Sequence, residues 1–250
     1  MSLSAETTLA RYTFRQILAR RRALGLAAFA LLPSLIALVH RANPAATGET
    51  TAAFVATLSA TLIVAVILPL TALVVGTGAF GSEIEDGTAL YVLAKPVARW
   101  RIVLVRVLCA GLATAALVSA STLLAGMVAG GDASARRVVY AFTAAVAVGA
   151  LVYCALFVML GLATRRALVA GLTYVLLWEG ALSGALRGLR FLSVRQYTLS
   201  IADALTDAGP AVLDASLGIG AAVTMAVAVA VLATVQAVRL LRRFEVGEAV

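Results

Sequence analysis

Six long apolar runs, separated by short polar stretches, dominate the pattern of this sequence. Most of them reach the roughly 20 residues that a helix needs to cross a bilayer. They cover residues 23–39, 52–80, 102–129, 138–163, 167–186 and 217–238. Because the runs are apolar on all sides and do not alternate, they favour helices over the strands of a membrane barrel. The sequence therefore predicts an all-α integral membrane protein with six transmembrane helices, folded as a single transmembrane domain over residues 1–250.

The composition supports a membrane protein and argues against a nucleic-acid-binding one. Hydrophobic residues make up 62% of the chain and charged residues 13%, whereas an average soluble domain has roughly 45–50% and 25%. The net charge of +8 would suit a nucleic acid only if the basic residues lay on a soluble face with aromatic side chains for stacking. They flank the apolar runs instead, so membrane topology accounts for them.

Residues 1–22 mix five arginines with Leu, Tyr, Phe and Ile. This mixture is typical of an amphipathic interfacial helix whose arginines face anionic headgroups; a frayed basic tail is the alternative. A cleaved signal peptide is disfavoured because the next apolar run continues to Val39 and is followed by His40 and Arg41 rather than by small residues. Pro33 is expected to kink this short first run.

The distribution of basic residues predicts the orientation. Fourteen of the twenty Lys and Arg residues lie near the termini, at 95–106 or at 165–166, and six lie in the alternate connections. Cytoplasmic connections carry the excess of Lys and Arg, so both termini and the polar hairpin 81–101 are expected to be cytoplasmic. The segment 187–214 is then external, and its amphipathic pattern predicts short re-entrant or surface helices between the fifth and sixth spans.

The polar hairpin 81–101 carries a pattern of its own. An acidic cluster at residues 83–86 comes first, and Pro96 closes the short apolar and aromatic run that follows. Negative charge is favoured at a helix N-terminus and proline cannot continue a helix, so we expect a short cytoplasmic helix in between. An ordinary loop is the alternative, but the local acidic excess and the apolar run favour a surface that docks a cytosolic partner.

The residues from Gly81 to Arg99 follow the pattern G-x-E-x-E-x-G-T-x-x-Y-x-L-x-K-P-V-x-R. This pattern resembles the coupling segment of the type-2 ABC exporter permease family, in its prokaryotic six-span branch. A second stretch, residues 174–180 followed by 192–197, is similar to another part of that family. The resemblance implies a coupling helix that docks an ATPase. The residues implied in this ATPase coupling are Glu83, Glu85, Asp86, Gly87, Thr88, Leu90, Tyr91, Lys95, Pro96 and Arg99.

The resemblance also implies partners, cofactors and a location. The chain would be the permease subunit of an ATP-binding cassette transporter and would couple ATP hydrolysis by two copies of a cytosolic ATPase subunit to substrate movement, with export as the expected direction. A second permease copy or a related permease would complete the path across the bacterial plasma membrane. ATP and Mg would be bound by the ATPase, with no cofactor in this chain. The alternative function is an ATPase-driven membrane anchor or mechanotransmission subunit that acts on an envelope protein.

The residues exclude an ATPase site in this chain and provide no catalytic set. A phosphate-binding P-loop needs Lys between Gly and Ser or Thr, whereas the only lysine, Lys95, lies between Ala94 and Pro96. The single histidine, His40, has no ligand partners in sequence and is expected at the membrane interface. The two cysteines lie inside apolar runs without metal-type spacing. We therefore expect neither a metal site nor an enzyme.

Glu179 is the one acidic residue within the predicted spans and is the candidate for an intramembrane polar site. An ionisable group at that depth is costly and indicates a function by default. Three roles are open: binding a cationic substrate group, relaying a proton, or pairing with Arg187 or Arg190. The alternative is that Glu179 lies near the external interface and is hydrated.

Overall fold

The computed structural model describes residues 20–43, 49–85, 98–164, 166–182, 192–206 and 217–243. Helices make up nearly all of this part of the chain and no strand occurs in it, so the all-α prediction is confirmed. Five helical segments are long and apolar enough to cross a membrane. They are Leu24–Ala42, Thr51–Phe80, Arg99–Ala129, Ala133–Ala163 and Ile219–Arg242. The predicted fifth run instead contains a shorter apolar helix, Ala167–Gly180, so the described residues hold five spans of full length where six were predicted.

The first span is irregular in the middle. Helix α2 (Arg20–Ala30) and helix α3 (Leu32–Ala42) meet at Leu31. Helical hydrogen bonds still cross this residue, because the Leu31 N–H donates to the Ala27 carbonyl and the Leu35 N–H donates to the Leu31 carbonyl. Pro33 has no N–H to donate, and a proline ring clashes with the carbonyl four residues earlier, so the irregularity falls in the turn before Pro33. The interfacial helix predicted for residues 1–22 lies almost wholly outside the described residues.

The second span is continuous but changes its helical register. It runs through α4 (Thr51–Leu58), the π-helix η2 (Ser59–Ile67) and α5 (Leu68–Glu85). The Leu68 N–H donates to the carbonyl of Ile63, five residues back, and Pro69 follows directly. Proline has no N–H, and its ring clashes with the carbonyl four residues earlier in an α-helix. The wider π turn lets the chain pass Pro69 while it remains helical.

Helix α5 continues past Phe80, the predicted end of the second span. Its last turn contains Glu83 and Glu85, which the sequence analysis assigned to the N-terminal end of a separate cytoplasmic helix. That assignment is wrong for these two residues, because their backbone belongs to the C-terminal end of α5. A glycine inside a helix costs only about 1 kcal/mol relative to alanine. Close packing between helices at such glycines offsets this cost, and the glycines before Glu83 do not end the helix.

Helices α7 (Arg99–Ala129) and α8 (Ala133–Ala163) form a long antiparallel pair. The turn between them contains Gly130 and Gly131, with φ angles of 74° and 109°. Residues with a Cβ atom rarely adopt such angles. These two glycines therefore allow the chain to reverse within three residues.

Asp132 caps the start of α8. Its carboxylate accepts a hydrogen bond from the Ser134 hydroxyl at 2.6 Å and one from the Ala135 N–H at 3.1 Å. These bonds, led by the one from Ser134, lower the pKa of Asp132. The cap satisfies one of the N–H groups that a helix start leaves without an intrahelical partner, and it fixes where α8 begins.

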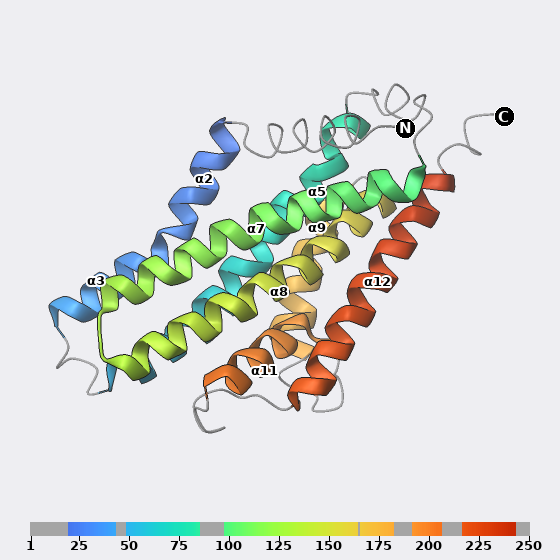
Figure 1. Cartoon of the computed structure of the whole chain (residues 1–250). Helices are drawn as coiled ribbons and strands as arrows, with labels where there is room; N and C mark the ends of the chain where they lie inside the picture. The colour runs from blue at the N-terminus through green and yellow to red at the C-terminus, as the bar shows by residue number, and fades with distance from the viewer. Residues whose placement is uncertain are drawn as a thin grey trace.

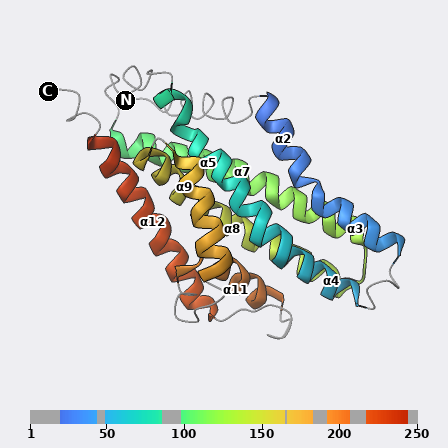
Figure 2. The ribbon, with the colours of Figure 1, turned by 180° about the vertical axis from the view of Figure 1, so that it is seen from behind.

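Helix α8 lies at the centre of the bundle. It packs against α5 and α7, and also against α9 (Ala167–Thr173), α11 (Val194–Thr206) and α12 (Ile219–Arg243). Figures 1 and 2 show these neighbours from opposite sides. Phe142, Tyr153 and Phe157 of α8 are almost completely buried. The core of the described molecule is therefore built around the fourth predicted span.

The helix ends gather at two ends of the molecule (Figures 1 and 2). At one end α5, α8 and α12 finish and α7 and α9 begin. We call this the hairpin end, because residues 86–97 connect α5 to α7 there. At the opposite end α7 turns into α8, and α11 and the start of α12 lie nearby. We call this the turn end. The long helices therefore alternate in direction, as membrane-crossing helices do.

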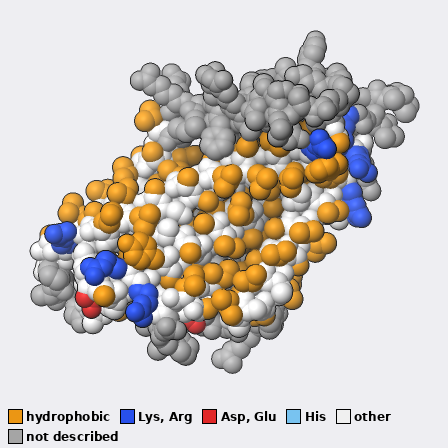
Figure 3. Space-filling view, viewed as in Figure 1, with side chains coloured by type: hydrophobic (Ala, Val, Ile, Leu, Met, Phe, Trp, Pro, Cys, Tyr) orange, Lys and Arg blue, Asp and Glu red, His pale blue; other side chains and the backbone are white. Residues whose placement is uncertain are grey.

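Large apolar side chains cover the outside of the helices, and charged side chains lie toward the two ends (Figure 3). Val39 on α3, Val169 on α9 and Leu232 on α12 are each more than 60% exposed. Soluble proteins rarely expose so much contiguous apolar surface. This surface suits contact with lipid or with other membrane helices.

Candidate functional site

Most of the predicted coupling residues lie outside the described part of the chain. This applies to Asp86, Gly87, Thr88, Leu90, Tyr91, Lys95 and Pro96. Glu83 and Glu85 lie by their backbone at the end of α5, and Arg99 is the first residue of α7. The two ends of the hairpin thus continue into helices that pack against each other. The docking role of the hairpin residues stays a prediction.

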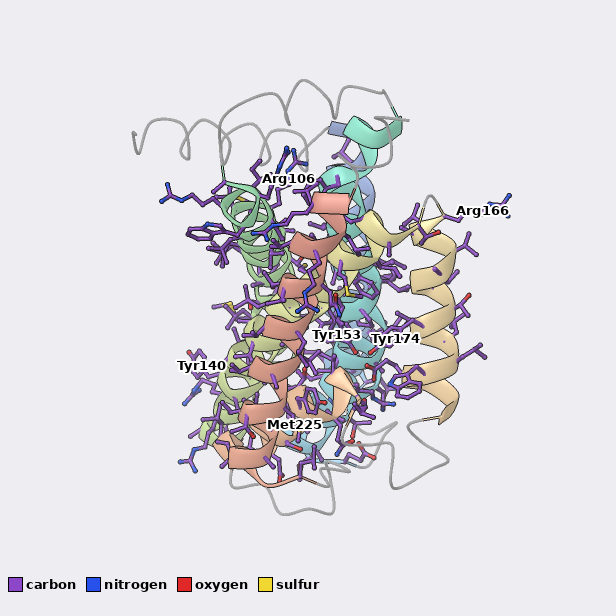
Figure 4. All side chains as sticks on the ribbon, turned by 90° about the vertical axis from the view of Figure 1, so that its right-hand side faces the viewer. Arg106, Tyr140, Tyr153, Arg166, Tyr174 and Met225 are labelled. Atoms are coloured by element: carbon purple, nitrogen blue, oxygen red, sulfur yellow. The ribbon has the colours of Figure 1, made fainter. Side chains whose placement is uncertain are left out.

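A buried arginine joins the two helices that flank the hairpin. Arg106 of α7 is 1% exposed, and its Nη1 donates a hydrogen bond to the Ala79 carbonyl of α5. Its guanidinium carbon lies 4.2 Å from the centre of the Phe80 ring, which is close enough for a cation–π interaction. Burying a charge is costly unless it is paired and hydrogen-bonded. These contacts therefore stabilise Arg106 in the interior near the hairpin end (Figure 4).

The sequence analysis did not identify Arg106 as a site residue. It counted this arginine only among the basic residues of the cytoplasmic side. The signal was nevertheless present, because Arg106 is the only charged residue within the third apolar run, 102–129. A lone charge inside a predicted span marks a residue that needs a partner from another helix.

The start of α7 has the features of a membrane–water interface. The guanidinium carbon of Arg101 lies 5.2 Å from the centre of the Trp100 ring, and Trp100 is about half exposed. Tryptophan is enriched at the headgroup level, and basic residues flank spans on the cytoplasmic side. Arg106 lies further along α7, on the bilayer side of this pair. The link between α5 and α7 therefore sits just inside the interface.

The second cluster is centred on Glu179. This residue belongs to the π-helix η3 (Tyr174–Leu182), which continues α9, and it is 3% exposed. Oε1 accepts hydrogen bonds from the Val194 N–H at 3.0 Å and from the Tyr174 hydroxyl at 3.2 Å. Oε2 accepts one from the Ser193 hydroxyl at 2.5 Å. Both carboxylate oxygens are thus engaged by neutral donors of the same chain.

The π register of η3 explains how Tyr174 reaches Glu179. In an α-helix of 3.6 residues per turn, positions five apart point about 140° away from each other. In a π-helix the hydrogen bonds connect residues five apart, so the same two positions lie nearly one above the other. The local widening of the helix therefore creates the pair, and π segments of this kind often occur at functional sites.

Aromatic side chains surround the carboxylate. Tyr153 of α8 and Tyr197 of α11 are 0% and 1% exposed, and both interact electrostatically with Glu179. The Phe157 ring stacks on Tyr153 at 5.9 Å and meets Tyr174 edge-on at 6.3 Å. Figure 4 shows Tyr153 and Tyr174 well inside the bundle, away from the hairpin end. The cluster is compact and joins α8, η3 and α11.

This geometry argues against one of the alternatives considered for Glu179. A hydrated carboxylate at the external interface does not fit a side chain that is 3% exposed. The suggested partners Arg187 and Arg190 lie outside the described residues. The sequence missed Ser193, whose only signal was its position just before an amphipathic helix, where serine is a favoured N-cap.

The remaining candidate ligands do not gather. Among the residues that the structure describes, no group of three or more His, Cys, Asp or Glu side chains could hold a metal ion. His40, which was expected at the membrane interface, lies in the last turn of α3. It is 6% exposed and stacks on the Phe54 ring at 3.7 Å. Cys109 and Cys154 are buried free thiols, as their apolar surroundings in the sequence predicted.

Comparison with known protein families assigns the chain to one of them. Residues 7–190 match the family described as ABC-2 family transporter protein. A search of curated proteins finds no relative that matches this chain. The family match covers the hairpin, both π segments and Glu179. The chain therefore belongs to the ABC-2 transporter family and is a multi-pass membrane permease component of an ABC transporter.

Proposed function

We propose that this chain is one of two permease subunits of an ATP-driven exporter in the bacterial plasma membrane. Each permease would receive motion from a cytosolic ATPase subunit through the hairpin 81–101, and ATP and Mg would be bound by that ATPase. ABC-2 permeases pair with such ATPases as a family. Substrates compatible with the Ala-, Leu- and Val-rich spans are lipids, hydrophobic small molecules and peptides.

The observation that carries this proposal is the arrangement of the hairpin end. Helices α5 and α7 enter and leave the hairpin side by side, and Arg106 bonds one to the other. A force applied to the hairpin would therefore act on both helices together. Both then continue through the bundle and pack against α8.

The arrangement of helix ends supports cytoplasmic termini. The start of α2 and the end of α12 lie at the hairpin end (Figure 1). With α9 and η3 as a further pass, the chain would cross the membrane six times. The basic residues concentrate on the hairpin side, which the positive-inside rule assigns to the cytoplasm.

A mild-detergent purification of this chain from its native membrane, with mass spectrometry of the bound proteins, tests the proposal. We expect a soluble subunit with a P-loop at near one-to-one stoichiometry with this chain. Recovery of an envelope protein without any ATPase would overturn the proposed coupling. It would favour an anchoring role instead.

A further inference from the structure

Helix α11 belongs to the segment that was predicted to form short re-entrant or surface helices, and most of it is buried. Nine of its residues are buried, and four of these are serine, threonine or glutamine. They are Val194, Gln196, Tyr197, Thr198, Leu199, Ser200, Ile201, Ala202 and Thr206. The helix packs against α8, α12 and η2. A Cβ on Gly149 of α8 would meet the Thr198 hydroxyl at 2.5 Å, so the approach is close.

The buried start of α11 depends on Glu179. The first N–H groups of a helix have no intrahelical acceptor. Here the Val194 N–H donates to Glu179 Oε1, and the Gln196 N–H donates to the Ser193 hydroxyl at 3.2 Å. That hydroxyl in turn donates to Glu179 Oε2. The carboxylate therefore caps α11 twice, directly and through Ser193, and its charge faces the positive end of the helix dipole.

A neighbouring side chain strengthens the same connection. The Trp178 Nε1–H donates to the Leu192 carbonyl at 3.3 Å. Two consecutive residues of η3 thus hold the segment 192–194, which lies fourteen to fifteen residues further along the chain. The connection is made by the side chains of Trp178 and Glu179.

We propose that Glu179 is a positioning residue that locks α11 to η3, so that both move as one unit at the turn end when the transporter changes access. The motion rests on the proposed function, whereas the lock rests on the contacts alone. The geometry favours this role over binding of a cationic substrate group. Both carboxylate oxygens already accept hydrogen bonds within the chain, and the side chains around them are buried.

Hydrogen exchange on the purified full-length chain tests the lock. In Glu179→Ala, we expect the amides at the start of α11 to exchange at least about tenfold faster, because a hydrogen bond to a charged group is lost together with the Ser193 cap. The amides of α8 should not change. Thr173→Val is the matched control, since the Thr173 hydroxyl donates to the Val169 carbonyl of its own helix. Unchanged exchange at α11 in Glu179→Ala would overturn the proposal.

Glu179→Gln tests the effect of the negative charge separately from the effect of the side-chain volume. The amide keeps the shape but loses the charge, and its NH₂ group opposes one of the donors. We expect faster exchange at the same α11 amides, to a smaller extent than in Glu179→Ala. If Glu179→Gln matches the wild type while Glu179→Ala loosens the whole chain, then Glu179 only fills space and the lock is overturned.

Spin-label distances test the joint motion. Leu177 of η3, Ala204 of α11 and Met127 of α7 are exposed, and both native cysteines are buried. A non-hydrolysable ATP analogue should change the distance between labels at Met127→Cys and Ala204→Cys in the complex with the ATPase. The distance between Leu177→Cys and Ala204→Cys should stay constant.

The same pair of labels also gives a measurement that does not depend on the proposed function. In Glu179→Gln without nucleotide, the distribution between Leu177→Cys and Ala204→Cys should broaden. An unchanged distribution would overturn the lock. A nucleotide-dependent change of this distance in the wild type would overturn the joint motion. If no ATPase binds the chain, the proposed function fails, and the nucleotide-free arm still decides the lock.

Discussion

Arg106 and Glu179 are two buried charges that are each held by a helix other than their own. Arg106 of α7 uses a carbonyl and a ring of α5, and Glu179 of η3 accepts from the Val194 N–H of α11 and from the Ser193 hydroxyl at its start. In each case the cost of burial is offset only while two elements stay together. Each residue therefore connects elements that lie apart in sequence.

Replacing Arg106 should weaken the contact between α5 and α7. We expect Arg106→Ala to lower the free energy of unfolding by about 2 kcal/mol, because a charged hydrogen bond and a desolvated cation–π contact are lost. Arg106→Lys should lose less, since it keeps the charge but not the planar stacking on Phe80. Thermal unfolding in detergent measures both. Arg137→Ala is the control, and this exposed residue should change stability by no more than about 0.5 kcal/mol. Equal stability of Arg106→Ala and the wild type would contradict the role of Arg106.

From the sequence, Glu179 could be recognised as an unusual residue, but the groups that it contacts could not be predicted. Glu179 stood out because it is the only acid within a predicted span. Its partners Ser193 and Val194 come from a different helix, and the bonds to them depend on how α11 packs. Arg106 is likewise the only charged residue within its predicted span, but the sequence analysis did not single it out, and its contact with Phe80 belongs to another helix. Contacts between helices that are distant in the sequence produce no local sequence pattern from which they could be predicted.

At the scale of elements, apolar runs predicted the helices but not their register. In the second span the chain passes Pro69 through a π segment and remains helical, and the apolar run did not indicate this change of register. No residue of the sequence indicated the π-helix η3, which contains no proline. The end of α5 was misjudged because the acidic cluster at residues 83–86 looked like the start of a new helix in the sequence. In the structure the backbone of Glu83 and Glu85 belongs to the last turn of α5.

Two glycines in the interface between α5 and α8 should respond differently to alanine. A Cβ on Gly76 would lie 2.8 Å from the Phe157 Cβ, which is fixed by its backbone. We expect Gly76→Ala to push the helices apart and to destabilise by about 1–3 kcal/mol. A Cβ on Gly161 would meet its nearest atom, the Thr77 carbonyl oxygen, at an ordinary 3.4 Å. Gly161→Ala should therefore be neutral or stabilising by up to about 1 kcal/mol through helix propensity. Chemical or thermal unfolding of both variants compares them, and equal effects would contradict this account of the packing.

At the scale of the whole molecule, the alternation of the long helices was predictable from the runs and the basic residues. Because the helices alternate, the orientation of the chain in the membrane can be tested with one residue at each end of the molecule. Ser134 at the turn end and Ala98 at the hairpin end are both exposed, and the native thiols are buried. We expect Ser134→Cys to react with a membrane-impermeant maleimide in intact cells, and Ala98→Cys to react only after permeabilisation. The opposite result would invert the topology.

In the proposed function the hairpin 81–101 docks the ATPase, and its acidic cluster offers a test of that role. Reversing Glu83, Glu85 and Asp86 to Lys should weaken association with the ATPase at least about tenfold, since each exposed ion pair contributes roughly 0.2–1 kcal/mol and is replaced by repulsion. Co-purification at low and high salt measures this, and the wild-type association should weaken with salt because exposed charges are screened.

The matched control for this charge reversal is Glu49→Lys. Glu49 is exposed near the turn end, and its reversal alters the net charge without touching the hairpin. Glu49→Lys should therefore leave co-purification of the ATPase unchanged. Wild-type recovery of the ATPase with the triple reversal would show that the acidic cluster is not the docking surface. The apolar run that follows it, with Leu90 and Tyr91, would then be the part of the hairpin on which the contact with the ATPase depends.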